Sequence, residues 1–152
     1  MLKSTIIAAF LCALSISIFA GNPPAAKKDT PTEGIQFFHG TFKEALAKAK
    51  KENKLVMMDC YTTWCGPCKY LKSKVFTDKA LGEYMNQKFV CVAIDYENGE
   101  GPAVAQQYPV EGYPTLYFLD AKGKVKKSVV GVPNPVASAA TVLLKEAKKV
   151  AQ

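Results

Sequence analysis

The sequence predicts an α/β fold in which a mixed central sheet is covered by helices on both faces. Short apolar runs alternate with stretches of helical periodicity in the order β-α-β-α-β-α-β-β-α, which is typical of a sheet packed between helices. Two runs near the C-terminus flank a turn and predict a hairpin. Hydrophobic residues make up 49% of the 152 residues, which is enough to form the core of one ordinary domain.

The first two elements are expected to be a short strand and an amphipathic helix. Residues 35–39 are a short apolar run. Thr41 and Glu44 then have the spacing of a capping box. Apolar residues follow at positions i, i+3, i+4 and i+7 from Phe42, which predicts a helix over residues 42–53.

A buried strand and two further helices are expected next. Residues 55–61 form a continuous apolar run interrupted only by Asp59, as in a strand buried on both faces. A helix is expected over residues 69–75. Asp78 then provides an N-cap for another helix over residues 79–85.

Similar patterns predict the remaining elements. They are a strand over 89–94, a short helix over 103–108, strands over 114–119 and 125–130, and a helix over 136–150. Residues 120–123, Asp-Ala-Lys-Gly, provide the turn chemistry of the hairpin. Asn134 and Pro135 are a suitable cap and first-turn pair for the last helix.

Residues 1–20 have the pattern of a secretory signal peptide. A short basic start precedes an uncharged, mostly apolar stretch that ends in Ala20, a small residue of the kind found before a cleavage point. An uncleaved membrane anchor is the alternative, although the stretch is short for a bilayer span and contains several hydroxyl side chains. Leu11 precedes Cys12 where lipid attachment would want a small residue, so a lipoprotein is not expected.

Residues 21–34 are expected to be a flexible linker. They contain three prolines and two glycines and show no apolar periodicity. The folded domain is therefore expected over residues 35–152. Removal of the signal would leave four cysteines in a compartment that permits disulfides.

The charge pattern argues against a nucleic-acid partner. The net charge is +7, but all 20 basic residues are lysines. Specific base and phosphate contacts rely on the bidentate guanidinium of Arg, which this chain lacks. The lysines are also scattered along the chain, as on an ordinary solvated surface.

Cys65 and Cys68 are the candidate reactive residues. They lie two residues apart, between the end of a buried strand and the start of a helix. At the helix cap, free backbone N–H groups and the helix dipole favour an anion, so Cys65 is expected to be the attacking thiolate. Cys68, one turn further on and more enclosed, is expected to be the resolving thiol. Pro67 stiffens the loop at a position where a missing N–H costs little.

Two other interpretations of the pair remain open. A zinc site also uses this cysteine spacing, but it needs a second pair of ligands, and Cys60, Cys91 and His39 do not have ligand-like spacing. An inert structural disulfide is the other alternative, although such a short loop would give little stabilisation.

The sequence resembles the thioredoxin superfamily at three separated motifs. Residues 64–69, Trp-Cys-Gly-Pro-Cys-Lys, match the active-site motif residue for residue. Asp59 matches the buried acid of the family, and residues 112–115, Gly-Tyr-Pro-Thr, match the segment that carries its cis-proline. Residues 41–69 and 75–78 further resemble an exported group that includes the soluble C-terminal domain of membrane thiol:disulfide interchange reductases. The resemblance implies a thioredoxin-like fold over about residues 35–150.

The resemblance also implies roles for individual residues. Cys65, Cys68 and Asp59 would be catalytic, and a desolvated Asp59 with a raised pKa would exchange a proton with Cys68. The alternative for Asp59 is a strand-end cap or a solvated side chain. Pro114 would follow a cis bond, although most X–Pro bonds are trans. The residues expected to contact substrate surround the motif: Trp64, Gly66, Pro67, Tyr113 and Pro114.

The predictions for Cys60, Cys91 and His39 rest on their positions in the sequence. Many thioredoxins carry a Lys near the buried Asp, and counting back from Asp95 puts Cys91 at that position. This would leave Asp59 without a cation and bring a third thiol near the site, unless Cys91 is simply a small core residue. Cys60 follows Asp59 and therefore points to the opposite face, so no Cys60–Cys91 disulfide is expected. His39 is expected to be an ordinary side chain rather than a ligand or base.

Together these observations predict an exported thiol–disulfide oxidoreductase that reduces protein disulfides. No dissociable cofactor and no metal are expected, because the Cys65–Cys68 dithiol is itself the redox group. The Gly-Pro pair between the cysteines resembles the reducing members of the family. A reductase in an oxidising compartment needs electrons, so the expected partners are a membrane-bound electron donor and disulfide-containing exported proteins, including cytochrome c precursors. The chain is expected to be a periplasmic or otherwise extracytoplasmic monomer.

Two alternatives to the reductase are retained. One is a disulfide isomerase or oxidase of the same fold. The other is a non-catalytic binding module or holdase that uses the apolar rim around Trp64, Tyr113 and Pro114. A thiol peroxidase is not expected, because a polarising Arg is absent.

Overall fold

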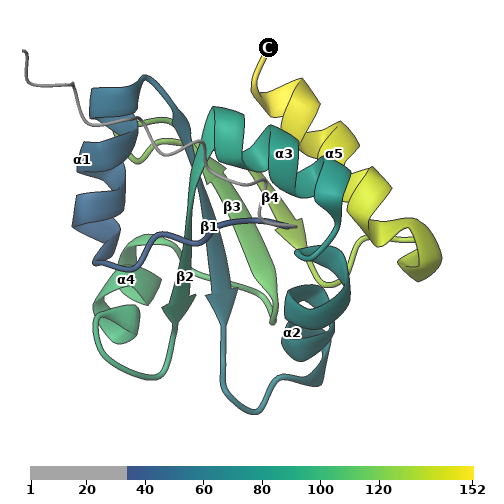
Figure 1. Ribbon diagram of the computed structural model, residues 1–152. Coiled ribbons are helices and arrows are strands. Elements are labelled where there is room, and N and C mark those ends of the chain that lie inside the picture. The colour runs from purple at the N-terminus through teal and green to yellow at the C-terminus, as the bar shows by residue number, and fades with distance from the viewer. Residues whose placement is uncertain (1–33) are drawn as a thin grey trace, which may run out of the picture.

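A computed structural model describes residues 34–152, and within them the predicted mixed sheet is present. Its four strands lie in the order β2-β1-β3-β4 (Figure 1). Their bounds are Leu55–Tyr61 for β1, Phe89–Asp95 for β2, Thr115–Leu119 for β3 and Val125–Val130 for β4. β1 runs parallel to β2 and antiparallel to β3, which in turn pairs antiparallel with β4. The fold class and these four strands are confirmed.

Helices cover both faces of the sheet, as predicted. The helix bounds are Phe42–Glu52 for α1, Gly66–Tyr70 for α2, Lys79–Lys88 for α3, Gly101–Gln107 for α4 and Ala139–Val150 for α5. Helices α1 and α4 cover one face, while α2, α3 and α5 lie on the other (Figure 1). The capping box of α1 is present, with Thr41 and Glu44 bonded to one another's backbone. Asp78 caps α3 through the N–H of Leu81.

Alternate side chains of β1 pack in two separate apolar layers, one on each face of the sheet. Met57 packs in the layer beneath α3 and α5, whereas Val56, Met58 and Cys60 pack in the layer beneath α1 and α4. Asp59 shares the face of Met57, because successive strand residues point to opposite faces. The residues of β1 between its two ends are all buried, as its apolar run predicted.

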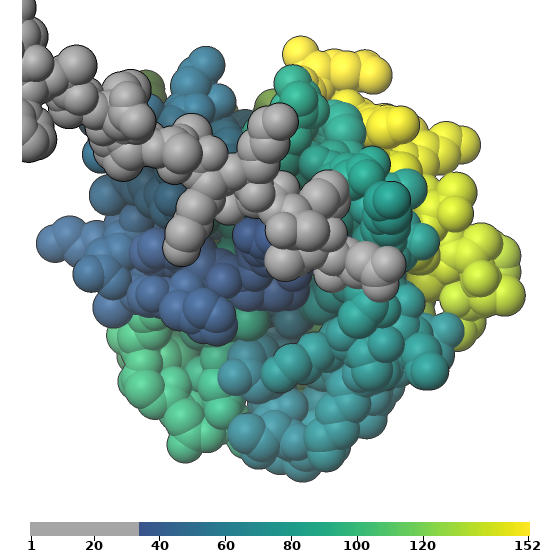
Figure 2. Space-filling view, viewed as in Figure 1, coloured from purple at the N-terminus to yellow at the C-terminus, as the bar shows by residue number. Residues whose placement is uncertain are grey.

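The expected strand over residues 35–39 is reduced to a single bridge between Phe37 and Cys91. One backbone bond of this segment reaches a strand, from Phe38 N–H to the carbonyl of Cys91 on β2, and the N–H groups at its start bond elsewhere. Ile35 N–H donates to the carbonyl of Phe76, and Gln36 N–H donates to the side chain of Asn86 on α3. Figure 2 shows the first described residues, in dark blue, crossing the front of the molecule.

The chain after the cysteine motif also differs from the predicted helix over 69–75. Helix α2 begins earlier, at Gly66, and residues Leu71–Val75 form a π-helix. The Ser73 hydroxyl donates to the carbonyl of Tyr70, which competes with the α-helical bond that this carbonyl would otherwise accept. Phe76 N–H then bonds to the carbonyl of Leu71, five residues back.

The last helix starts three residues later than predicted. Residues Val136–Ser138 form a 3₁₀ turn, and α5 begins at Ala139. Pro135 follows a cis bond and has an extended conformation, with φ −71° and ψ 144°, so it precedes the turn instead of occupying its first position. The expected cap and first-turn roles of Asn134 and Pro135 were therefore wrong.

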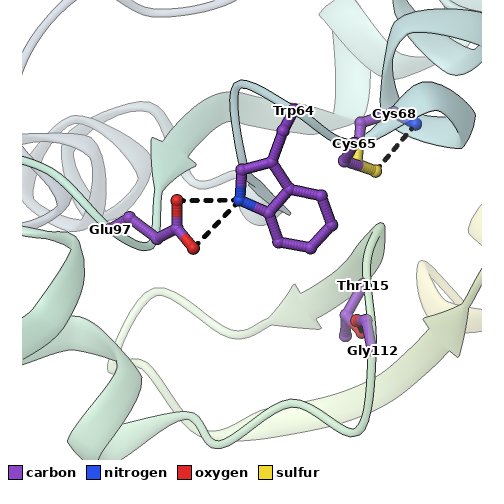
Figure 3. Close-up of a disulfide and its surroundings, with 6 residues drawn as sticks. All are labelled: Trp64, Cys65, Cys68, Glu97, Gly112 and Thr115. Atoms are coloured by element: carbon purple, nitrogen blue, oxygen red, sulfur yellow. Dashed lines mark hydrogen bonds between the residues drawn. A yellow bond between two sulfur atoms is a disulfide. The ribbon is translucent and has the colours of Figure 1, made fainter.

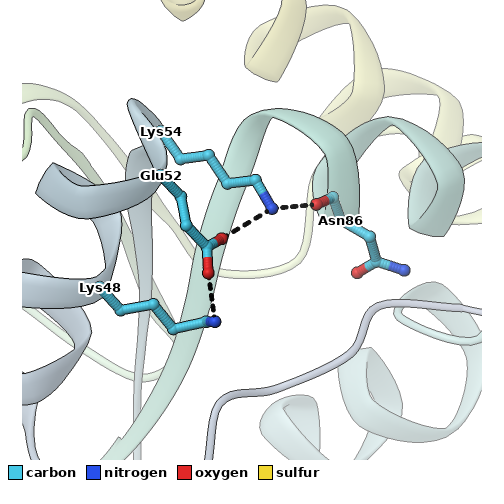
Figure 4. A network of polar contacts seen from close by, with 4 residues as sticks. All are labelled: Lys48, Glu52, Lys54 and Asn86. Atoms are coloured by element: carbon cyan, nitrogen blue, oxygen red, sulfur yellow. Dashed lines mark hydrogen bonds and ion pairs between the residues drawn. The ribbon is translucent and has the colours of Figure 1, made fainter. Parts of the chain in front are cut away.

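A polar network joins the end of α1 to α3 (Figure 4). Glu52 pairs with Lys48 and with Lys54, and Lys54 also donates to the backbone carbonyl of Asn86, 3.0 Å away. The Asn86 side chain points away from Lys54 and donates to the carbonyl of Gly34, 3.1 Å away.

The predicted signal peptide over residues 1–20 and the linker up to residue 33 lie outside the described residues. Among residues 34–152, no helix has the length and apolar content of a membrane span.

Replacing Gly82 with Ala is expected to destabilise the fold. In an exposed helix this exchange would stabilise by about 1 kcal/mol through helix propensity. Here a Cβ would lie 2.3 Å from backbone atoms of Gly34, so the segment must move away from α3. We expect a loss of about 1–3 kcal/mol in the free energy of unfolding, measured with urea.

Gly112→Ala is the matched control, because a Cβ there meets nothing within 4 Å. Its free energy of unfolding should change by less than about 0.5 kcal/mol. An increase in stability for Gly82→Ala would show that the segment at Gly34 is not seated on α3.

Candidate active site

The site lies where the central strand ends and α2 begins. β1 ends at Tyr61, and a short loop leads to Cys65, which is the N-cap residue of α2. The sulfur of Cys65 accepts the backbone N–H of Cys68, with 3.1 Å between nitrogen and sulfur. The prediction that Cys65 occupies a helix cap is confirmed. An anion on this sulfur is favoured by the same N–H and by the positive end of the helix dipole.

The two sulfurs of the motif are bonded to each other. The Cys65–Cys68 disulfide joins Cα atoms 5.3 Å apart. Cys68 was expected to be the more enclosed of the two, but Cys65 is 3% exposed and Cys68 5% exposed. Both cysteines are thus buried in the bonded state, while the intervening Gly66 and Pro67 are exposed. The enclosure of Cys68 relative to Cys65 was thus predicted wrongly for this state.

An exposed tryptophan flanks the disulfide (Figure 3). Trp64 is 65% exposed, and its indole N–H donates to both carboxylate oxygens of Glu97, at 3.0 and 2.9 Å. Its ring meets the Tyr113 ring edge to face, with centroids 6.0 Å apart. These contacts hold the indole in one position beside the sulfurs, and most of its surface remains exposed to solvent.

The loop before β3 forms another side of the site. The bond between Tyr113 and Pro114 is cis, as the resemblance implied. The Thr115 hydroxyl donates to the carbonyl of Gly112, 2.8 Å away. Gly131 N–H donates to the carbonyl of Pro114, 2.7 Å away, and this bond ties the loop to the end of β4. Pro114 itself is buried, whereas Tyr113 is partly exposed.

Asp59 is buried near the end of β1. It is only 6% exposed, and its Oδ1 atom has no hydrogen-bond partner. Loss of hydration raises the pKa of this carboxyl to about 7, and the positive charge of Lys72 opposes the rise. The prediction of a raised pKa is confirmed. The expectation that Asp59 has no cation near it was wrong. The positive charge comes from Lys72 on the π-helix and not from a residue of the neighbouring strand β2.

The free cysteines lie in different layers. Cys91 is aligned with Met57, and Ala93 is aligned with Asp59, so the expected position of Cys91 beside Asp59 was wrong by two residues. Cys60 and Cys91 are both buried and unbonded, on opposite faces of the sheet, as alternation predicted. Cys91 packs in the apolar layer beneath α3 and α5 and is therefore a core residue, and this burial raises the pKa of its thiol well above the ordinary value.

Cys60 is part of a buried polar chain that the sequence did not reveal. Its thiol donates to the hydroxyl of Tyr96, 3.1 Å away, and that hydroxyl donates to the carbonyl of Tyr108. Burial raises the pKa of the Cys60 thiol to about 12, so the thiol stays protonated at neutral pH. His39 is exposed, in agreement with an ordinary surface side chain.

Glu97 was the main residue of the site that sequence reasoning missed. It lies two residues beyond the end of β2, the strand parallel to β1. Because the carboxyl ends of adjacent parallel strands lie at the same edge of a sheet, residues that follow both strands meet. Within residues 34–152, no cluster of three or more candidate metal ligands occurs.

A disulfide closed across the first turn of a helix at the end of β1, with a cis-proline just before the adjacent strand β3, is typical of the class of thiol–disulfide oxidoreductases. The comparisons with known proteins agree. A family model described as a thioredoxin-like domain matches residues 42–145. The chain belongs to this thioredoxin-like family.

Individual relatives differ in how much of their length this chain matches. Thioredoxin H3 of Arabidopsis thaliana is 34% identical over 88 residues, which are 58% of this chain and 69% of that protein. The thiol:disulfide interchange protein DsbD of Vibrio vulnificus is 30% identical over 121 residues, which are 71% of this chain but only 20% of that protein. A solved structure from Bacteroides thetaiotaomicron, described as a proposed disulphide-isomerase, is 42% identical with a TM-score of 0.66. The matched region covers 78% of this chain and 94% of the chain in that solved structure.

Asp59→Asn should change how stability depends on pH. The folded chain holds the Asp59 proton up to a pH of about 7, whereas the carboxyl of the unfolded chain loses it near its ordinary pKa of 3.8. The wild-type free energy of unfolding therefore falls as the pH rises through this interval, because the folded state binds more protons. At pH 8 the variant should be more stable than the wild type by up to about 4 kcal/mol, and at pH 4 the difference should nearly vanish.

Urea unfolding at pH 4, 6 and 8 measures this difference. The exposed Glu111→Gln variant is the control and should follow the wild type at each pH. A difference between Asp59→Asn and wild type that stays constant with pH would show that Asp59 does not titrate in this interval.

Proposed function

We propose that this protein is exported and reduces disulfides of other exported proteins by dithiol exchange. The observation that carries the proposal is the Cys65–Cys68 disulfide at the first turn of α2, with the Cys65 sulfur accepting the N–H of Cys68. The bonded pair is the oxidised product of such a reaction. The dithiol is the redox group, so the proposal includes no dissociable cofactor and no metal.

In the first step, the Cys65 thiolate of the reduced protein attacks one sulfur of a client disulfide. The client S–S bond breaks, a mixed disulfide between Cys65 and the client forms, and the other client sulfur leaves as a thiolate that takes up a proton. The free N–H groups at the start of α2 stabilise the attacking thiolate, and this lowers the energy needed to form it at neutral pH.

In the second step, Cys68 resolves the mixed disulfide. Asp59 accepts the proton of Cys68 as the sulfur of Cys68 attacks Cys65, and the second client thiolate is released. The client has then gained two electrons and the protein is oxidised. A buried carboxyl with a pKa of about 7 suits this role, because its pKa lies near the working pH.

The client is proposed to bind along the exposed surface around the sulfurs. Trp64 offers a flat apolar wall, and the loop at Tyr113 and Pro114 offers backbone groups to an extended peptide. Gly66 and Pro67 are exposed between the two cysteines and leave room for the chain of the client. One chain holds all these residues, and we propose that it acts as a monomer.

The direction of electron flow is proposed from the Gly-Pro pair between the cysteines. Potentials of reducing family members lie roughly 90 mV below those of isomerases, which corresponds to about 4 kcal/mol in favour of reduction. A reductase in an oxidising compartment must be re-reduced, so we include a membrane-bound electron donor as partner. The signal-like pattern of residues 1–20 supports an extracytoplasmic location.

Cys65→Ser should abolish turnover of insulin disulfides, with a loss of at least about 1000-fold, because the attacking sulfur is gone. Cys68→Ser should instead accumulate the mixed disulfide with the client, since nothing resolves it. Insulin precipitation with dithiothreitol as electron source measures the first effect, and non-reducing electrophoresis measures the second.

Cys91→Ala is the matched control, because it removes a cysteine from the core and should retain turnover. Undiminished insulin reduction by Cys65→Ser would contradict the mechanism. Equal protection of an aggregating client by Cys65→Ser and wild type, without turnover by either, would favour the holdase.

An isomerase is the second candidate, and the Bacteroides thetaiotaomicron relative favours it. The reduction potential of the Cys65–Cys68 pair separates the two functions. A reductase predicts a potential near about −270 mV, and an isomerase predicts one near about −180 mV. The measurement is an equilibrium titration with glutathione, and recovery of activity by scrambled ribonuclease is the complementary assay.

A further inference from the structure

We infer that Glu97 is a positioning residue, which holds the Trp64 indole beside the disulfide and so sets the affinity for protein clients. The inference rests on the proposed function, because it concerns how that site receives its substrate. Figure 3 shows the indole lying between the Glu97 carboxylate and the disulfide. Glu97 therefore acts on the client through Trp64 and not on the sulfur chemistry.

The indole of Trp64 is held on two sides although it is largely exposed. Glu97 accepts the indole N–H with both carboxylate oxygens, and the ring of Tyr113 meets the indole at 88°. The ring of Tyr113 is itself supported edge to face by the buried Tyr96, with centroids 6.0 Å apart. An exposed side chain without such contacts would lose rotamer freedom when a client binds, and that loss weakens binding.

Hydrogen bonds within the chain hold the loop that carries Glu97, and they do not require a bound client. Glu97 N–H donates to a carboxylate oxygen of Asp95, and the side chain of Asn98 donates to the other. The backbone N–H of Tyr96 donates to the carbonyl of Tyr61, the last residue of β1. Glu97 and Trp64 therefore stand on two strand ends that are bonded to each other, so the indole is in place before a client arrives.

Trp64 is the only tryptophan of the chain, so the tryptophan fluorescence comes from this residue alone. We expect Glu97→Ala to lower the fluorescence anisotropy of the indole. We also expect it to raise the KM for insulin about three- to tenfold while kcat stays within about twofold, as befits a lost hydrogen bond that serves binding. The rate with dithiobis-nitrobenzoate, a small disulfide that needs no extended surface, should stay unchanged.

Two variants distinguish the hydrogen bond that Glu97 makes to the indole from the negative charge that Glu97 carries. Glu97→Gln removes the charge but keeps a carbonyl acceptor for the indole N–H, so it should restore most of the anisotropy and of the KM. Glu111→Gln removes another exposed acid from the loop that leads to Tyr113, and it should match the wild type.

The inference is overturned if Glu97→Ala leaves both the anisotropy and the KM unchanged. It is also overturned if kcat falls equally for insulin and for the small disulfide, or if Glu97→Gln and Glu111→Gln raise the KM as much as Glu97→Ala does. A wild type that does not reduce insulin would refute the proposed function alone. The anisotropy, and titration of Trp64 fluorescence with insulin, need no turnover and would still decide the role of Glu97.

Discussion

The chemistry depends on one contact, in which the sulfur of Cys65 caps the first turn of α2. A helix needs an acceptor for its free N–H groups, and a thiolate gains stability from such donors, so a single geometry satisfies the helix and the reactive sulfur. The same turn brings Cys68 within bonding distance, with 5.3 Å between the two Cα atoms. The central position of β1, bonded on both edges, fixes where the chain enters this turn.

Alternation along β1 gives adjacent residues different environments. Asp59 faces the layer of α2, α3 and α5, without a hydrogen bond for its Oδ1, whereas Cys60 faces the layer of α1 and α4 and bonds to Tyr96. A buried carboxyl that lacks partners lowers stability once it ionises, and a packed apolar side chain would not. Asp59 lies near the carboxyl end of β1, next to the cysteine loop. A local loss of stability of this kind is common at functional sites.

The sequence predicted the features that depend on local pattern. The capping box at Thr41, the apolar run of β1 and the hairpin turn after β3 each specify their structure within a few residues. The opposite orientations of Cys60 and Cys91 also followed from alternation, because an error of two residues in the register leaves each side chain on the same face of the sheet. The register itself did not follow, since the alignment of Cys91 with Met57 depends on how far α3 and its flanking loops carry the chain.

What could not be predicted depends on contacts between distant segments. The segment at Ile35 pairs with β2 through a single bridge, because Phe76 and Asn86 accept the N–H groups at its start, and nothing within residues 35–39 signals this. Glu97 was missed for a related reason, since it is 33 residues from Trp64 along the chain. Parallel strands bring their carboxyl ends to one edge, so residues that follow β2 are candidates for any site at the end of β1. A motif thus identifies the sulfur pair, whereas the surface proposed to receive a client is assembled from the ends of neighbouring strands.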